Sequence, residues 1–104
     1  MRRARVSIHG RRAGVLWELE PRKLYRFVYD AGYDGPPISL ALPVSDQTFE
    51  FSGFPPFFDG LLPEGPQLDA LCRLRKLDRD DAFGQLLAVG LDVVGAVTIE
   101  EELP

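Results

Sequence analysis

The chain has 104 residues, of which 45% are hydrophobic and 27% charged, a composition that is typical of one globular domain and excludes a disordered chain. No apolar run approaches the roughly 20 residues of a membrane-spanning helix, and the basic start lacks the apolar core of a secretory signal. The single cysteine, Cys72, cannot form an internal disulfide. We therefore expect residues 1–104 to form one domain in a reducing, cytoplasmic compartment of a bacterial cell.

The net charge of −4 conceals an uneven distribution along the chain. Residues 1–26 carry eight Lys or Arg and two Glu, a local charge of +6, and residues 27–104 carry four Lys or Arg and fourteen Asp or Glu, a local charge of −10. A basic segment can bind nucleic acid, but arginines also protect the edge of a hairpin from pairing with another chain, and we favour this second interpretation. The acidic remainder argues against nucleic acid as the main partner.

The first half of the chain has the period-two pattern of strands. Residues 3–10 and 13–20 are predicted to form a hairpin with its turn at Gly10 and Arg11. We expect Trp17 to point into the core. The residues that share a face are Ala4, Val6 and Ile8 in the first strand and Val15, Trp17 and Leu19 in the second.

A third strand is predicted over residues 23–30, followed by a loop rich in glycine and proline over residues 31–37. Residues 38–44 and 47–51 continue the extended pattern. The apolar residues at period two in these segments are Tyr25, Phe27 and Tyr29, and then Ile38, Leu40 and Leu42.

The apolar period changes to that of a helix after residue 65. A first helix is predicted over residues 66–77 with Pro66 in its first turn, and a second over residues 82–89, with its N-cap at Asp78 or Asp80 and its end at Gly90. Residues 93–99 then form a final strand, and residues 100–104 a frayed acidic tail. The residues expected to face inward are Leu68, Leu71 and Cys72, with Leu74 nearby, in the first helix and Phe83, Leu86 and Leu87 in the second.

Strands followed by two helices and a last strand favour an α+β fold with a small, mainly antiparallel sheet. The last strand must return to that sheet, so we expect the two helices to pack on it together. Between the strands and the helices lies an irregular segment, residues 54–67 (FPPFFDGLLPEGPQ), rich in phenylalanine, proline and leucine.

The residue types offer little support for catalysis. His9 stands alone at a strand end, so we expect no metal site. Neither G-x-S-x-G nor a glycine-rich phosphate-binding pattern occurs, so we expect no catalytic residue and no cofactor. Asp59 and Glu64 could form an acid and base pair, but no second reactive group accompanies them. The second predicted helix lacks Lys and Arg, which argues against a DNA-reading helix-turn-helix.

Five motifs follow one another along almost the whole chain: VSIHGRRAGVLWEL, YRFVYDAGY, PISLALPV, FFDGLLPEG and DAFGQLLAVGLDVVGAVTI. In this order they resemble the N-terminal subdomain of HipA-type serine/threonine kinase toxins. The FFDGLLPEG segment and the D-x-F-x-x-L-L-x-x-G-x-D-x-x-G-A-V string carry most of the specificity. No kinase body follows in this sequence, and a free-standing subdomain of this kind is similar to HipS, the small component of HipBST-type toxin–antitoxin systems.

The resemblance implies an antitoxin that is not an enzyme. In HipBST-type systems HipS neutralises a shortened kinase, HipT, and HipB is a helix-turn-helix DNA-binding protein. We therefore expect non-covalent binding to a HipT-like kinase near its active site, with a HipB-like protein as a further partner in a ternary complex. Two alternatives remain open: an N-terminal fragment of a HipA-type kinase toxin, and a DNA-binding accessory subunit of the toxin–antitoxin complex.

A subdomain separated from a larger fold keeps the face that packed on the missing part, and we expect residues 57–67 at the centre of that face. One exposed leucine would be an anchor, and Glu64 would meet a basic residue of the kinase cleft. Alternatively, Phe54, Phe57 and one of the leucines belong to the core. The expected partner-binding residues are Phe57, Phe58, Asp59, Leu61, Leu62, Pro63, Glu64, Pro66 and Gln67.

Overall fold

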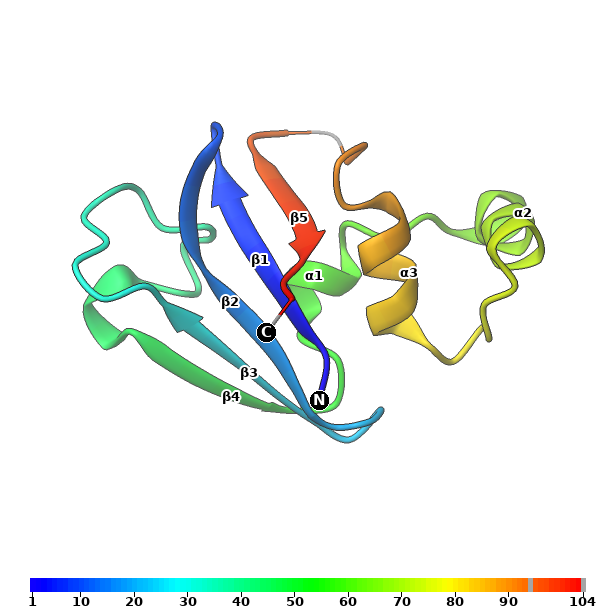
Figure 1. The fold of residues 1–104 in the computed structure, drawn as a ribbon, viewed down its shortest axis with the longest axis horizontal. Coiled ribbons are helices and arrows are strands. Elements are labelled where there is room, and N and C mark those ends of the chain that lie inside the picture. The colour runs from blue at the N-terminus through cyan, green and yellow to red at the C-terminus, as the bar shows by residue number, and fades with distance from the viewer. Residues whose placement is uncertain (94, 104) are drawn as a thin grey trace.

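The protein folds around one five-stranded antiparallel sheet (Figure 1). The computed structural model describes residues 1–93 and 95–103. The strand order across the sheet is β4-β3-β2-β1-β5, so the last strand returns beside the first. The predicted α+β class, antiparallel sheet and returning strand are confirmed. The strands are β1 (Arg3–Ile8), β2 (Arg11–Glu20), β3 (Leu24–Tyr29), β4 (Thr48–Ser52) and β5 (Val97–Glu101).

The final strand is displaced along the chain from its predicted position. β5 begins at Val97 and includes Glu100 and Glu101, which were expected to belong to a frayed tail. Antiparallel pairing with β1 orders the backbone of these two acidic residues. Val94 of the predicted strand and Pro104 of the predicted tail lie outside the described residues.

Residues 38–44 form turns instead of an extended segment, and a 3-10 turn begins at Val44. The hydroxyl of Tyr29 accepts a hydrogen bond from the N–H of Ile38 (3.1 Å) and donates one to the carbonyl oxygen of Leu42 (2.5 Å). These two bonds fold the segment back on itself. Ile38 and Leu42 are buried as a result, whereas Leu40 is 97% exposed.

One face of the sheet carries the core, and Trp17 lies on the other face. Ala4 pairs with Leu16 across β1 and β2, and Arg3 pairs with Trp17, so Leu16 is fully buried while Trp17 is only half-buried. The guanidinium of Arg3 lies over the Trp17 ring, 5.0 Å from its centre. The prediction that Trp17 points into the core is therefore wrong. It failed because the inward position two residues after Leu16 is taken by a charged residue, Glu18.

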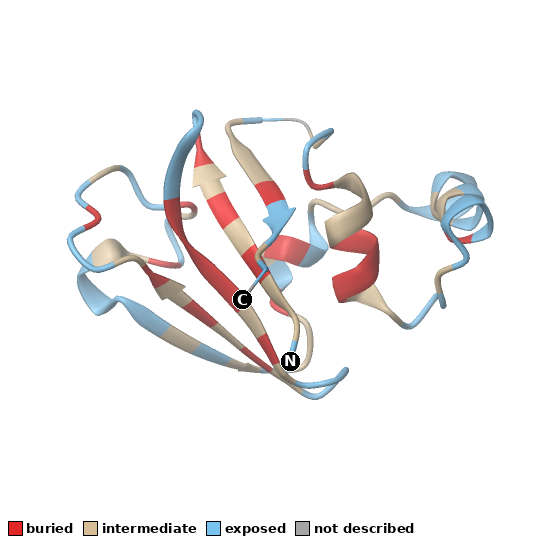
Figure 2. Ribbon diagram, in the orientation of Figure 1, coloured by how far each residue is buried: buried red, intermediate tan, exposed pale blue. Residues whose placement is uncertain are grey.

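Three helices follow β4: α1 (Pro56–Asp59), α2 (Gly65–Arg75) and α3 (Ala82–Val89). α1 and α3 bring the fully buried rings of Phe58 and Phe83 to the core on the inner face of the sheet. α2 lies beyond α3 and projects from the body of the molecule (Figure 1), and most of its surface is exposed (Figure 2). α3 thus packs on the sheet as predicted, whereas α2 reaches the body through α3.

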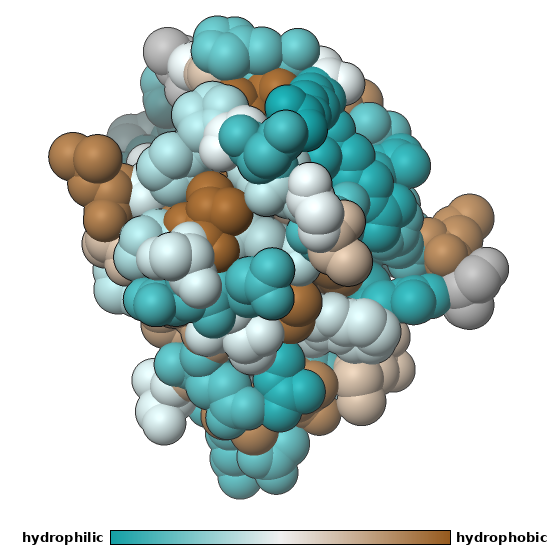
Figure 3. All heavy atoms as spheres, turned by 90° about the vertical axis from the view of Figure 1, so that its left-hand side faces the viewer, coloured by the Kyte–Doolittle hydropathy of each residue, from teal (hydrophilic) through white to brown (hydrophobic). Residues whose placement is uncertain are grey.

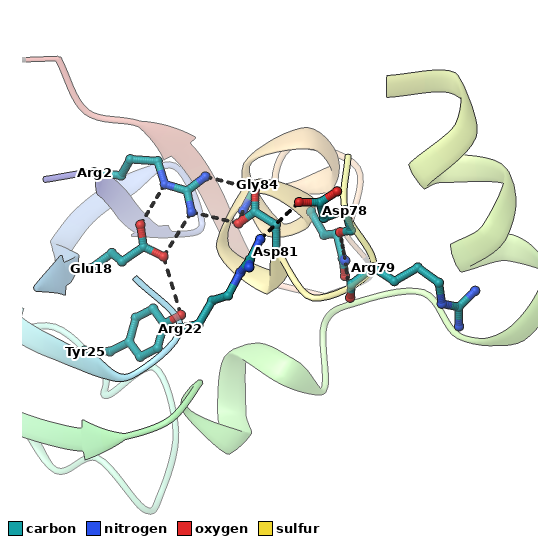
Figure 4. Close-up of polar contacts among 9 residues, drawn as sticks. Arg2, Glu18, Arg22, Tyr25, Asp78, Arg79, Asp81 and Gly84 are labelled. Atoms are coloured by element: carbon teal, nitrogen blue, oxygen red, sulfur yellow. Dashed lines mark hydrogen bonds and ion pairs between the residues drawn. The ribbon is translucent and has the colours of Figure 1, made fainter. Parts of the chain in front are cut away.

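Arg2 joins the sheet to the start of α3 (Figure 4). Its guanidinium donates hydrogen bonds to both carboxylate oxygens of Glu18 (2.8 and 2.9 Å) and to both of Asp81 (2.7 and 3.2 Å). Glu18 is only 4% exposed, and it also accepts a long hydrogen bond from the Tyr25 hydroxyl (3.4 Å). We call Arg2, Glu18 and Asp81 the Arg2 bridge. It compensates the buried charge of Glu18, which would otherwise be costly.

Asp81 is also the N-cap of α3. Its carboxylate accepts a hydrogen bond from the N–H of Gly84 (3.0 Å), so the predicted caps, Asp78 and Asp80, are wrong. Hydrogen bonds from Arg2 hold the pKa of Asp81 below its usual value, and the Gly84 N–H acts in the same direction against the opposing effect of burial. Both contacts therefore favour the ionised carboxylate.

Replacing Asp81 by asparagine tests the Arg2 bridge separately from the cap, because an asparagine oxygen can still accept from Gly84. We expect Asp81→Asn to lower the free energy of unfolding at pH 7 by about 1–2 kcal/mol. The loss is modest because the Arg2–Asp81 ion pair is partly exposed to solvent, which weakens it relative to a buried pair. The pKa of Asp81 is lower in the folded state than in the unfolded state. Its contribution to the free energy of unfolding is therefore fully present above the unfolded pKa of about 3.9 and is lost as the pH falls through the folded pKa.

Urea unfolding followed by circular dichroism measures this difference between wild type and Asp81→Asn from neutral to acid pH. The neighbouring exposed Asp80, changed to asparagine, is the matched control and should alter stability by less than about 0.5 kcal/mol. A difference between wild type and Asp81→Asn that stays constant down to pH values below about 3.9 contradicts the bridge.

Gly90 ends α3 as predicted. Glycine is required at this position because of close packing, and not because of an unusual backbone angle. Its φ is −58°, which any residue can adopt. A Cβ atom at this position would lie 2.1 Å from the carbonyl oxygen of Ile99 in β5. The absence of a side chain therefore allows α3 to end directly against the returning strand.

We expect Gly90→Ala to destabilise the fold by about 1–3 kcal/mol, because β5 would have to move to admit the methyl group. Gly60 is a matched control: its φ is −64°, and a Cβ atom there would come no closer than 3.4 Å to another atom. Gly60→Ala should therefore be neutral or slightly stabilising. Equal unfolding midpoints in urea for the two variants would show that α3 and β5 are not packed this closely.

Candidate partner-binding site

The predicted contact segment is not a single irregular loop. It consists of the short helix α1, a turn over residues 60–64 and the first turn of α2. In the turn, the N–H of Leu61 donates to the carbonyl of Phe58 (3.1 Å) and the N–H of Leu62 to that of Asp59 (3.1 Å). Gly65 then adopts a φ of 56°, which reverses the chain into α2 and favours glycine at that position. These local bonds give the exposed part of the segment a defined shape.

Phe58 anchors the segment to the core. Its ring is fully buried, with its centre 5.9 Å from that of Phe27 in β3 and 5.1 Å from that of Phe57. A fully buried ring does not face a partner, so the prediction of Phe58 as a contact residue is corrected. Phe54 and Phe57 are half-buried against the core, in agreement with the alternative that they contribute to it.

The other predicted contact residues lie at the surface to different extents. Leu61 and Leu62 are both half-buried and pack against the core, so neither is the exposed anchor that we expected. Pro63 is also half-buried. The exposed members of the set are Asp59, Glu64, Pro66 and Gln67. The surface offered by this segment is therefore acidic and polar at its tip, with apolar side chains partly accessible between the charges.

The turn lines one side of a groove of about 250 Å³, and the start of α3 with the loop before it lines the other. Asp59 at the end of α1, Glu64 in the turn and Arg79 in the loop are the charged residues that line it. Arg79 forms an ion pair with Asp69 of α2, whereas neither Asp59 nor Glu64 has an ion-pair partner among the described residues. The groove thus keeps two uncompensated carboxylates at its edge.

Gln85 fixes the wall of the groove opposite the turn. This side chain is 2% exposed, and its amide donates to the backbone carbonyls of Asp78 (3.1 Å) and Arg79 (3.0 Å). The two bonds hold the loop that carries Arg79. Neither Gln85 nor Arg79 was predicted as a site residue, although a single amide among the inward residues of an apolar helix was an available signal.

Asp59 and Glu64 lie in the groove without a histidine or cysteine among its lining residues. Within residues 1–93 and 95–103, no group of three or more His, Cys, Asp or Glu is placed to hold a metal ion. His9 lies in the exposed β1–β2 turn, as expected for a turn residue. In the same part of the chain no helix combines the length and the apolar character needed to cross a membrane.

The arginines of the basic N-terminal segment are largely neutralised by the acidic remainder of the chain. Six of the eight cations in residues 1–26 form ion pairs, and all six have a carboxylate partner beyond residue 26. A cation held by a carboxylate is a weak ligand for a phosphate backbone. The six paired arginines are Arg2, Arg5, Arg11, Arg12, Arg22 and Arg26.

Comparison with known proteins places this fold and turn in a family. A protein of Haemophilus influenzae described as uncharacterized is 32% identical over 102 residues, which make up 98% of this chain and 94% of the relative. The solved structure of the N-terminal domain of HipA toxin matches with a TM-score of 0.79 and 31% identity, over 99% of this chain and 94% of that one. A family model described as the HipA N-terminal domain matches residues 4–100. The chain therefore belongs to the HipA N-terminal domain family.

Proposed function

We propose that this chain is an antitoxin that binds a HipT-type serine/threonine kinase in the cytoplasm and neutralises it without enzymatic activity of its own. The contact is non-covalent and lies near the kinase active site. It uses the exposed and half-buried residues of the predicted set, with the buried Phe58 supporting them from below. A HipB-like helix-turn-helix protein joins the two in a ternary complex.

Membership of the HipA N-terminal domain family fits a toxin–antitoxin context. This chain spans 94% of the relative from Haemophilus influenzae, so the relative is close to one such domain in length. That length leaves no room for a kinase body in the relative. It supports a role through binding, in which a domain of this kind acts on a kinase supplied by another chain.

The observation that carries the proposal is the pair of uncompensated carboxylates, Asp59 at the end of α1 and Glu64 in the following turn, in a segment that Phe58 fixes to the core. A kinase holds the phosphates of its nucleotide with a lysine, bound metal ions and backbone N–H groups, so its cleft is electropositive. Carboxylates on a preorganised turn complement such a cleft, and a fixed turn loses little conformational entropy on binding.

The two alternatives make different predictions. For an N-terminal fragment of a HipA-type toxin, the kinase body would continue in the same reading frame. For a DNA-binding accessory subunit, the isolated protein would bind DNA with a strong salt dependence. The pairing of the N-terminal arginines with acidic residues of the same chain disfavours direct DNA binding.

Binding to a HipT-type kinase encoded beside this chain tests the proposal. We expect the two proteins to co-purify as a stable complex and co-expression to relieve the toxicity of the kinase. Glu64→Arg should weaken the affinity at least about tenfold, because it places a positive charge against an electropositive cleft. Isothermal titration calorimetry with the purified kinase measures this change.

Asp46→Arg is the matched control, since Asp46 is exposed, is also without an ion-pair partner among the described residues, and lies in the 3-10 turn before β4. Its affinity should equal that of wild type. Persistent toxicity in the presence of folded protein would overturn the antitoxin role. Equal affinities for Glu64→Arg and Asp46→Arg would move the contact away from the turn.

A further inference from the structure

Helix α2 has an exposed face that its packing leaves without a partner. Gln67, Ala70 and Leu74 recur at spacings of three and four residues, so they lie on one side of the helix. All three are exposed, and Leu74 is 80% exposed although it is a large apolar residue. The prediction that placed Leu74 near the inward stripe is thus not met, while Cys72 on the opposite side is buried.

This face continues the proposed kinase contact. Gln67 belongs both to the predicted contact set and to the exposed face of α2, and Ala70 and Leu74 extend it toward the end of the helix. The end of the molecule that carries loop residues 31–47 lies opposite α2 (Figure 1) and is largely hydrophilic, with apolar spots separated from one another (Figure 3). Gln67, Ala70 and Leu74, by contrast, follow one another along a single side of α2.

The cations beside Leu74 also lack partners. Seven of the twelve Lys and Arg residues form ion pairs among the described residues, and three of the remaining five are Arg73, Arg75 and Lys76. Arg73 and Arg75 flank Leu74 in the last turn of α2, and all three cations are exposed. In a chain whose other arginines are mostly neutralised, this is the place where positive charge stays available.

We propose that the Gln67–Ala70–Leu74 face of α2 is a second docking surface for the same kinase, and that it occupies an apolar groove with carboxylates on its rims. Leu74 fills the groove, while Arg73 and Arg75 pair with the carboxylates on either side. An amphipathic helix seated in a groove is a common mode of recognition, with anchors at spacings of three and four residues.

This inference rests on the proposed function and deepens it. The complete surface is dipolar: Asp59 and Glu64 present negative charge at one end, and Arg73 and Arg75 present positive charge at the other. Such a surface fits a complementary partner in one orientation only, because reversal would bring like charges together. The acidic turn would thus be directed to the electropositive cleft.

Binding kinetics of the kinase with wild type, Leu74→Asp and the double variant Arg73→Glu/Arg75→Glu test the proposal. We expect Leu74→Asp to weaken the affinity at least about tenfold, mainly through faster dissociation. The double variant should slow association and reduce its dependence on salt, because charges at a rim act mainly on encounter. Leu40→Asp, at a position that is 97% exposed outside this surface, and Lys23→Glu, a cation without an ion pair among the described residues, are the controls and should bind as wild type.

The possible outcomes distinguish a failure of the second docking surface from a failure of the proposed antitoxin function. Absence of any complex with wild-type protein overturns both. A wild-type complex with unchanged affinity in both α2 variants, each shown by circular dichroism to be folded, overturns the second docking surface alone. A wild-type protein that self-associates, and that Leu74→Asp makes monomeric without changing the affinity for the kinase, assigns the face to a second copy of this chain and also overturns the proposal.

Discussion

The contact between Arg2 and two carboxylates sets the relation between the sheet and the helices. Glu18 lies on the inner face of β2, where its charge must be compensated if the sheet is to pack at all. Arg2 supplies that compensation and with the same guanidinium holds Asp81, which caps α3. The position of α3 is thus tied to the sheet at its N-cap, Asp81, and at its C-cap, Gly90. One wall of the groove beside the acidic turn belongs to this helix, so the shape of the candidate site depends on the bridge.

The ion pairs explain why the chain has a basic N-terminal segment and an acidic remainder. Basic and acidic parts of the chain neutralise each other across the sheet, which removes the main argument for nucleic acid binding. Uncompensated carboxylates remain on the turn before α2, and a cluster of uncompensated cations remains at the end of α2. Isolated surface ion pairs contribute little stability, so the consequence of this arrangement is in recognition, where complementary charge governs orientation and the rate of encounter.

The sequence predicts most of this fold, because hydrophobic period and local turn signals determine most of its elements. The hairpin, the third strand, the two longer helices and the antiparallel sheet all follow from such patterns. The errors arise where a distant side chain decides the outcome. Trp17 was assigned to the wrong face because the compensation of Glu18 by Arg2 is not visible locally. Asp81 caps α3 in place of the predicted Asp78 or Asp80, and its carboxylate also binds the distant Arg2. The Tyr29 hydroxyl turns residues 38–44 away from extended structure.

The candidate site was predictable in position and less so in detail. Proline, glycine and acidic residues in the segment between strands and helices pointed to the correct surface, but a pattern of letters does not show which of several apolar residues is buried. Phe58 is in the core, and both leucines of the turn are half-buried. Leu74 of α2 is instead a large apolar residue that is 80% exposed, although it was predicted to lie near an inward stripe.

The central claim is that this domain neutralises a HipT-type kinase by occupying the neighbourhood of its active site. Phosphotransfer by the purified kinase, measured while this protein is added in increasing amounts, tests it most directly. Kinase activity should fall in proportion to the protein added and reach background at about one equivalent, as expected for tight binding. Full phosphotransfer activity in a kinase that is saturated with this protein would contradict the account.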